Sequence, residues 1–266
     1  MRIGKQDNAF TAIATSDDQS ITVRGHDLVN DLIGQIDFTD YFWLLVCGHR
    51  PTQTQTAMMN ACLVAIAEHG LVPSVQAARM TLAAAPEAWQ GAMAAGLLGM
   101  GTVVAGSTEV AGRFLAEVVA AGGDESAAVA ALERLKAAKQ KVPGLGHPQH
   151  TAGDPRADKL LAIADDLGIS GAHVAALRHL GAKAPSLMNR PLPINVSGAI
   201  PAVMLDVGFP AEALKGVPIL ARCAGLIGHL TEELARPIGF ALSYQATREQ
   251  RYTGALPPGF TPTSSS

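Results

Sequence analysis

The chain has 266 residues, of which 48% are hydrophobic, 16% are charged and 5% are aromatic, and its formal net charge is −3. A chain of this length and apolar content can bury a sizeable core, in one large domain or two interlocked ones. The slight negative charge, the few aromatic residues and the lack of a long Lys/Arg run argue against nucleic acid as a partner.

The cysteine pattern and the apolar runs predict the cellular compartment of the protein. Cys47, Cys62 and Cys223 are odd in number and lack CxxC spacing, which favours reduced thiols over disulfides or a zinc site. The first seven residues lack the apolar core of a signal peptide. No run of about 18 uninterrupted apolar residues occurs, so no membrane-spanning helix is expected. We therefore expect a cytoplasmic protein that does not interact with membranes.

The predicted secondary structure is mainly α-helical. Weak alternation over residues 10–24 predicts one short hairpin that turns at 16–19. After it, apolar residues recur at helical spacing, with Thr52 or Thr54 as a cap near the first long helix and Ser197 as the cap of a later one. The expected helices cover residues 52–69, 74–85, 87–98, 107–121, 125–140, 156–167, 170–181, 199–207 and 210–233.

One loop carries the strongest functional signal. It reads Val142-Pro143-Gly144-Leu145-Gly146-His147 and is followed by Asp154-Pro155-Arg156. Its glycines let the backbone come close to a ligand, and a histidine can transfer protons near neutral pH. An arginine can hold a carboxylate through two parallel hydrogen bonds. The segment predicts half of a site for a small polycarboxylate; the alternative is a plain Gly/Pro loop with an incidental surface histidine.

Other polar residues stand in apolar surroundings. His69 follows a helix end, where the dipole favours its charged form, although Glu68 and His69 could also be a simple capping pair. Arg222 lies in an apolar helix and needs an anionic partner, from the protein or a ligand. His147 and His150 share a spacing that metal ligands use, but no third ligand is evident, so no metal site is predicted.

Taken in order, these segments resemble the citrate synthase superfamily, and most of all its short citryl-CoA lyase branch. The resemblance covers residues 21–254. It implies a citrate synthase fold, with a large helical domain (1–105 and 200–266), a smaller helical domain (106–199) and a homodimer or tetramer. The markers are Arg24-Gly25-His26-Asp27, Glu68-His69, the 144–147 and 154–156 segments, Asn195-Val196-Ser197-Gly198, the 222–229 helix and Ala235-Arg236-Pro237.

The resemblance also implies roles for single residues. His69 would bind the oxaloacetate part of the substrate, and His147 would polarise its carbonyl or, in reverse, the citryl hydroxyl. Carboxylates would be held by Arg156, Arg222 and Arg236, the last from the other subunit, with Arg248 and Arg251 as possible substitutes. The backbone of Val142, Gly144, Leu145 and Gly146 would contact coenzyme A. No permanently bound cofactor is implied: an acyl-CoA thioester and a small di- or tricarboxylate are substrate and product.

Two departures bear on the chemistry. The synthases place an enolate-steadying histidine where this chain has Val104, a change that favours the lyase branch. The family's catalytic aspartate falls on Ser197, and a serine with an ordinary pKa cannot be that acid or base. The resemblance places His147, His69 and Ser197 at the catalytic positions. Because Ser197 replaces the aspartate, three outcomes stay open: cleavage of a citryl-CoA-like thioester, a related C–C reaction on another acyl-CoA, or a non-catalytic binding protein.

Overall fold

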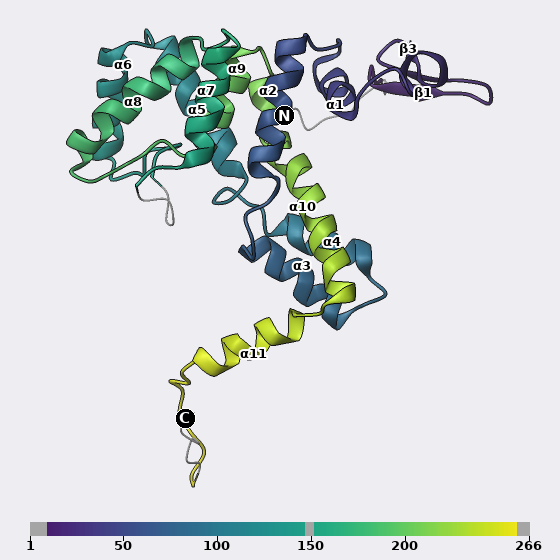
Figure 1. Ribbon diagram of the computed structural model, residues 1–266. Helices are drawn as coiled ribbons and strands as arrows, with labels where there is room; N and C mark the ends of the chain where they lie inside the picture. Colours follow the sequence, from purple (N-terminus) through teal and green to yellow (C-terminus); the bar gives the residue numbers. More distant parts are fainter. Residues whose placement is uncertain (1–9, 147–151, 260–266) are drawn as a thin grey trace. The chain divides into compact units, whose positions relative to one another are not determined.

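The computed structural model describes residues 10–146 and 152–259 and confirms a mainly helical protein (Figure 1). Its contacts divide the chain into two compact units. Unit 1 comprises Met1–Ile66 and Ala105–Pro218, and unit 2 comprises Ala67–Val104 and Ile219–Ser266. Each unit is taken by itself below. The two-domain division expected from the family resemblance stays a prediction.

Unit 1 begins with a small antiparallel sheet. Strands β1 (Ala14–Ser16), β2 (Ile21–Val23) and β3 (His26–Asp27) lie in that order, and Ala14 pairs with Val23. The Asp17 carboxylate closes the first turn by accepting the N–H of Gln19 at 2.9 Å and of Ser20 at 2.7 Å. The hairpin prediction is confirmed. The third strand and the following π-helix (Leu28–Leu32) are too short for periodicity to reveal.

Unit 1 also contains the following helices, one of which is buried. They are α1 (Phe38–Cys47), α2 (Gln53–Ala67), α5 (Gly106–Ala120), α6 (Glu125–Ala137), α7 (Pro155–Asp166), α8 (Ala172–Met188) and α9 (Val196–Asp206). Helix α9 contacts α5, α7 and α8. Its residues from Gly198 to Met204 are all buried, as expected for a helix that is apolar on every side.

Two helix caps show what the sequence did and did not predict. Thr52 caps α2: its hydroxyl accepts the Gln55 N–H at 3.3 Å, and the Gln55 side chain accepts the Thr52 N–H at 2.8 Å. The assignment of Ser197 as a cap is wrong. Asn195 has the extended backbone and accepts the Gly198 N–H at 3.1 Å, so α9 begins at Val196 and Ser197 is already helical.

Unit 2 contains α3 (Pro73–Ala84), α4 (Trp89–Leu98), α10 (Gly216–Ala235) from Ile219 onward, and α11 (Gly239–Glu249). Helices α3 and α4 pack against each other and against α10 through a core of small and branched side chains. A Cβ on Gly96 would lie only 2.9 Å from Leu226 Cδ1, so α4 and α10 are in close contact there. The buried core residues are Val75, Ala78, Leu82, Ala92, Leu226 and Leu230.

The stretch Ala211–Ala235 is long and apolar enough to cross a membrane by length and composition alone. The sequence-based expectation required an uninterrupted apolar run, which Arg222 breaks. A buried core helix passes the same test, and both Arg222 (4% exposed) and Glu233 (3% exposed) are buried against protein here. The stretch is therefore weak grounds for a membrane span.

Candidate functional site

The predicted coenzyme A loop is held against the start of α9 by hydrogen bonds within unit 1. Gly146 N–H donates to Pro193 O at 2.7 Å, Asn195 N–H donates to Gly144 O at 3.0 Å, and the Asn195 amide donates to Gly146 O at 2.6 Å. Both loop glycines have φ +78°, which favours glycine. A Cβ on Gly198 would lie 2.5 Å from Gly144 O, so the two backbones touch.

Asp154 joins the predicted carboxylate-binding arginine to the same helix start. Its side chain is fully buried. It accepts Arg156 Nε and NH2 at 2.9 Å each, and its Oδ2 also accepts the Val196 N–H at 2.9 Å. Burial would raise the pKa of Asp154, but the hydrogen bonds from Arg156 and Val196 outweigh it and lower that pKa. Arg156 is thus held in place by the buried Asp154 carboxylate. The same carboxylate binds Val196, the residue before Ser197.

Ser197 points toward a second serine. The Ser107 hydroxyl, on the second residue of α5, donates to the Ser197 hydroxyl at 3.0 Å. Both serines are half-buried. The position that the family resemblance assigns to a carboxylate therefore carries a pair of hydroxyls from two packed helices.

A groove of ≈510 Å³ lies between α2 and α7 in unit 1. Arg156 and Lys159 contribute positive charge to a lining that is otherwise mostly apolar. Arg156 therefore borders a space large enough for part of a ligand. The lining residues are Asn60, Ala61, Val64, Ala65, Pro155, Arg156, Lys159, Leu160 and Ile163.

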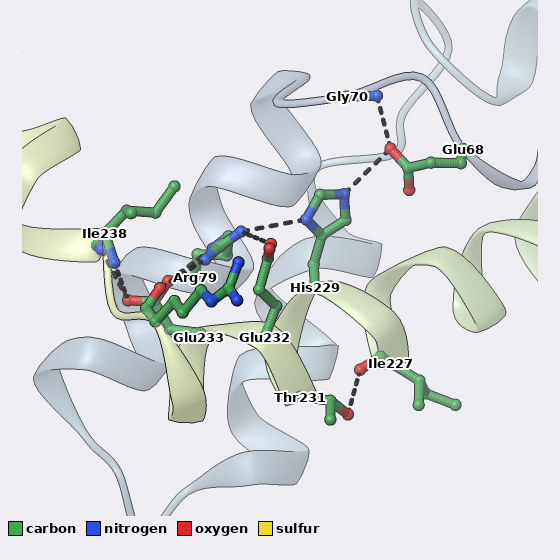
Figure 2. Close-up of polar contacts among 11 residues, drawn as sticks. Glu68, Gly70, Arg79, Ile227, His229, Thr231, Glu232, Glu233 and Ile238 are labelled. Atoms are coloured by element: carbon green, nitrogen blue, oxygen red, sulfur yellow. Dashed lines mark hydrogen bonds and ion pairs between the residues drawn. The ribbon is translucent and has the colours of Figure 1, made fainter.

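In unit 2, the Glu68 carboxylate contacts the backbone of the turn that follows it and the ring of His229 (Figure 2). The Glu68 carboxylate accepts the N–H of His69 at 2.8 Å and of Gly70 at 2.6 Å, and it pairs with His229 Nε2 at 3.0 Å. Burial would raise the pKa of Glu68, but these hydrogen bonds outweigh it and lower that pKa. Glu68 therefore does more than cap a helix end. It links the turn that contains His69 to His229 of α10.

A buried arginine continues this network, and Figure 2 shows it beside His229 and two glutamates of α10. Arg79 NH1 donates to His229 Nδ1 at 3.4 Å and to Glu232 at 2.7 Å, and its Nε donates to Glu233 at 2.6 Å. Arg79 NH2 donates to the Arg236 carbonyl at 3.2 Å. A His229 ring with its hydrogen on Nε2 satisfies both of its contacts. The network holds the backbone of Arg236, whose own side chain is exposed.

Glu233 also organises the chain after α10. Its Oε1 accepts the N–H of Ile238 at 2.9 Å and of Gly239 at 2.7 Å, the start of α11. Burial would raise the pKa of Glu233, but the hydrogen bonds from Arg79 and these N–H groups lower it. Arg222 lies in the same α10 with 4% exposure. One turn later, a Cβ on Gly225 would be 2.3 Å from Ala67 O, so this part of α10 is in contact with the segment that leads to His69.

The structure places the predicted residues in two sets. Unit 1 brings together Arg156, Ser197 and the 142–146 loop, while unit 2 holds His69, Arg222 and Arg236. His147 and His150 lie outside the described residues. Among the residues that are described, no three His, Cys, Asp or Glu side chains form a metal-binding group, and Cys47, Cys62 and Cys223 are free thiols.

Three residues that matter here were missed by the sequence reading. Asp154 was noted only as part of the Asp-Pro-Arg motif, although it is the acceptor that fixes Arg156. Arg79 and Ser107 were not singled out from the sequence. A charged residue in an apolar helix is itself a signal, because a buried guanidinium needs partners.

Comparisons with known proteins identify the family and the fold. The citrate synthase C-terminal domain family matches residues 47–238. A citryl-CoA lyase from Hydrogenobacter thermophilus is 30% identical and superposes with a TM-score of 0.84 over 98% of each chain. An ATP citrate lyase from Methanosaeta concilii, solved with (3S)-citryl-CoA, has a TM-score of 0.76 over 97% of this chain and 43% of its own, at 18% identity.

A curated relative is similar over a shorter region. Citrate synthase 2 of Bacillus subtilis (strain 168) is 25% identical over 187 residues, which is 70% of this chain and 49% of that protein. The chain thus spans about half the length of that relative, whereas it matches the Hydrogenobacter enzyme end to end. The family match covers well over half of the chain, and the chain therefore belongs to the citrate synthase family.

Proposed function

We propose that the protein is a citryl-CoA lyase-like enzyme, which cleaves a 3-hydroxy-3-carboxyacyl-CoA into an acyl-CoA and a 2-oxoacid such as oxaloacetate. The observation that carries the proposal is the match to citryl-CoA lyase over 98% of both chains at 30% identity. The braced 142–146 loop and the fixed Arg156 support it, because a lyase must hold both the coenzyme A and the carboxylates of its substrate.

In this proposal, different residues bind different groups of the substrate. Arg156, Arg222 and Arg236 pair with carboxylates, and His69 binds the oxaloacetate part. His147 takes up the hydroxyl proton or polarises the forming carbonyl, a task suited to a histidine near neutral pH. Backbone groups of Val142, Gly144, Leu145 and Gly146 contact the coenzyme A.

We also propose a cytoplasmic homo-oligomer, a dimer or a tetramer. Unit 2 exposes large apolar side chains that include Leu98 at 86%, Leu234 at 62% and Phe240 at 70%. Self-association would remove such surface from water, and closed two-fold contacts are the commonest solution. An arginine such as Arg236 could then serve the site of a second subunit.

The test is a pair of incubations followed by analysis of the thioesters. Purified protein is given citryl-CoA in one arm, and oxaloacetate with acetyl-CoA in the other, while free CoA, acetyl-CoA and oxaloacetate are quantified. The proposal expects acetyl-CoA and oxaloacetate to form in the first arm, and His147→Ala to abolish that turnover. Turnover that survives His147→Ala would contradict the catalytic role of this residue.

A second candidate is favoured by one observation, the hydroxyl pair at Ser107 and Ser197 in place of a carboxylate. A family member without an acid/base group there could bind an acyl-CoA and a carboxylate without reacting, or act on another acyl-CoA. A binding protein would show micromolar or tighter affinity for these ligands by calorimetry with no thioester turnover. A changed acyl preference would show turnover with a longer or branched acyl-CoA but not with the acetyl compound.

A further inference from the structure

In the Ser107–Ser197 contact, Ser107 is the donor and Ser197 is the acceptor. A serine hydroxyl has one hydrogen and two lone pairs. Ser107 gives its hydrogen to Ser197 at 3.0 Å, so Ser197 accepts with a lone pair and directs its own hydrogen elsewhere. Within residues 10–146 and 152–259, the structure records Ser107 as the side-chain partner of Ser197. Both side chains are half-buried, so a ligand can reach them.

The geometry of the pair is rigid because the two helices that carry it are in tight contact. A Cβ on Gly112 of α5 would lie 2.3 Å from Leu214 Cδ1 and 3.2 Å from Pro201 Cβ of α9. The 142–146 loop also restrains the start of α9, because the backbones of Gly198 and Gly144 are in contact. A donor held this firmly does not have to reorganise when charge develops on a ligand.

We propose that Ser107 is a positioning residue of the proposed lyase: by donating to Ser197, it makes the Ser197 hydroxyl a hydrogen-bond donor to the thioester oxygen of the leaving acyl-CoA enolate. The inference rests on the proposed function. It assigns Ser197 a role opposite to that of a carboxylate, which would accept a hydrogen bond or a proton at this position.

The chemistry of the cleavage gives such a donor a defined target. The C3 hydroxyl loses its proton, the C2–C3 bond breaks, and C3 becomes the carbonyl of the 2-oxoacid. The bonding pair moves onto the thioester as an enolate, whose carbon then takes up one proton to give the acyl-CoA. One proton leaves and one returns, so no co-reactant is needed. Negative charge on the thioester oxygen is greatest between these steps, where a fixed donor stabilises it most.

The experiment uses the full chain and two readouts. The first is kcat and KM for citryl-CoA cleavage. The second is the affinity, by calorimetry, for carboxymethyl-CoA with oxaloacetate, since its carboxylate resembles the enolate oxygen. The variants are Ser107→Ala, Ser107→Thr, Ser197→Ala and the Ala/Ala double variant. Ser186→Ala is the matched control, because Ser186 is an exposed serine of α8 that donates to Lys183 O.

Ser107→Ala should lower kcat roughly tenfold with little change in KM, and should weaken carboxymethyl-CoA binding by a similar factor, the value of a hydrogen bond to a charged group. Ser107→Thr keeps the hydroxyl and should restore both readouts to within a few-fold of wild type. Because Ser107 acts through Ser197, the double variant should be no worse than Ser197→Ala alone. Ser186→Ala should behave as wild type.

The outcomes separate this inference from the proposed function. Wild-type turnover together with an unaffected Ser107→Ala variant, or with additive losses in the double variant, overturns the positioning role and leaves the lyase intact. A wild type that cleaves no citryl-CoA but binds carboxymethyl-CoA in a Ser107-dependent way overturns the lyase and supports the donor pair. A wild type that neither cleaves nor binds overturns both.

Discussion

Asp154→Asn tests whether a buried carboxylate holds Arg156 in place. The side chain of Asp154 is 0% exposed and that of Arg156 is 19% exposed. The aspartate accepts hydrogen bonds from both Arg156 and the Val196 N–H. Asparagine preserves the shape but removes the charge and replaces one oxygen with a donor. If the asparagine NH2 group takes the place of Oδ1, it faces the Arg156 Nε–H. If it takes the place of Oδ2, it faces Arg156 NH2 and the Val196 N–H, so donor meets donor in either orientation.

The expected loss follows from those contacts. Hydrogen bonds to charged groups contribute about 1.5–3 kcal/mol each, and removing one partner of a buried ion pair costs about 3–5 kcal/mol. Water still reaches part of Arg156, so we expect a loss of about 2–4 kcal/mol in the free energy of unfolding at pH 7. Because the pKa of Asp154 is lowered, the contribution is complete above the unfolded pKa of about 3.9 and disappears as pH falls through the lower folded value.

The assay is urea unfolding followed by far-UV circular dichroism, from pH 7 down to acid. Asp165→Asn is the matched control, since the side chains of the Asp165–Arg178 pair are 48% and 45% exposed and solvent screening leaves such a surface pair little effect on stability. The difference between wild type and Asp154→Asn should also narrow at low pH. If Asp154→Asn costs no more than the control, the carboxylate does not hold Arg156, and the reasoning is refuted.

Three further predictions follow from other contacts. Arg222→Ala should weaken binding of citrate or oxaloacetate tenfold or more by calorimetry, because a charge-assisted pair is lost; unchanged affinity would remove Arg222 from the site. Asp206 accepts the N–H of Gly171, His173 and Val174 at the start of α8, so Asp206→Ala should cost about 2 kcal/mol in urea unfolding. Burial would raise the pKa of Asp206, but its hydrogen bonds lower it, so this cost should shrink as pH falls below about 4; a pH-independent cost would contradict the assignment. Light scattering at micromolar protein should give a dimeric or tetrameric mass, and a monomer would exclude a cross-subunit role for Arg236.

Local patterns were the part of the fold that the sequence could predict. The hairpin at residues 14–23 and the Thr52 cap depend on neighbours a few residues apart, and both are present. Helix α11 was missed because Pro237 reads as a stop. The helix restarts two residues later, since Glu233 accepts the first N–H groups of the new turn.

Interactions between distant residues could not be predicted in the same way. Arg79 and Glu233 are 154 positions apart, and nothing near either one indicates the other. Asn195 and Ser197 are both good helix caps, and the choice between them is made by tertiary contacts of Asn195 with Gly144 and Gly146. The carboxylate that holds Arg156 is only two residues away, but its burial and its bond to the Val196 N–H, 42 positions further on, depend on the tertiary fold.

The touching backbones of Gly144 and Gly198 restrict how this enzyme can evolve. Neither glycine can gain a side chain unless the opposite segment moves, and Val196 is buried with its N–H bound to Asp154. Residue 197 lies between these two fixed neighbours, yet its own side chain is half-buried and meets another side chain rather than backbone. A substitution there can alter the reaction while the loops that recognise the substrate keep their positions. New chemistry could therefore arise in this fold by a single replacement, without a new binding site having to be built.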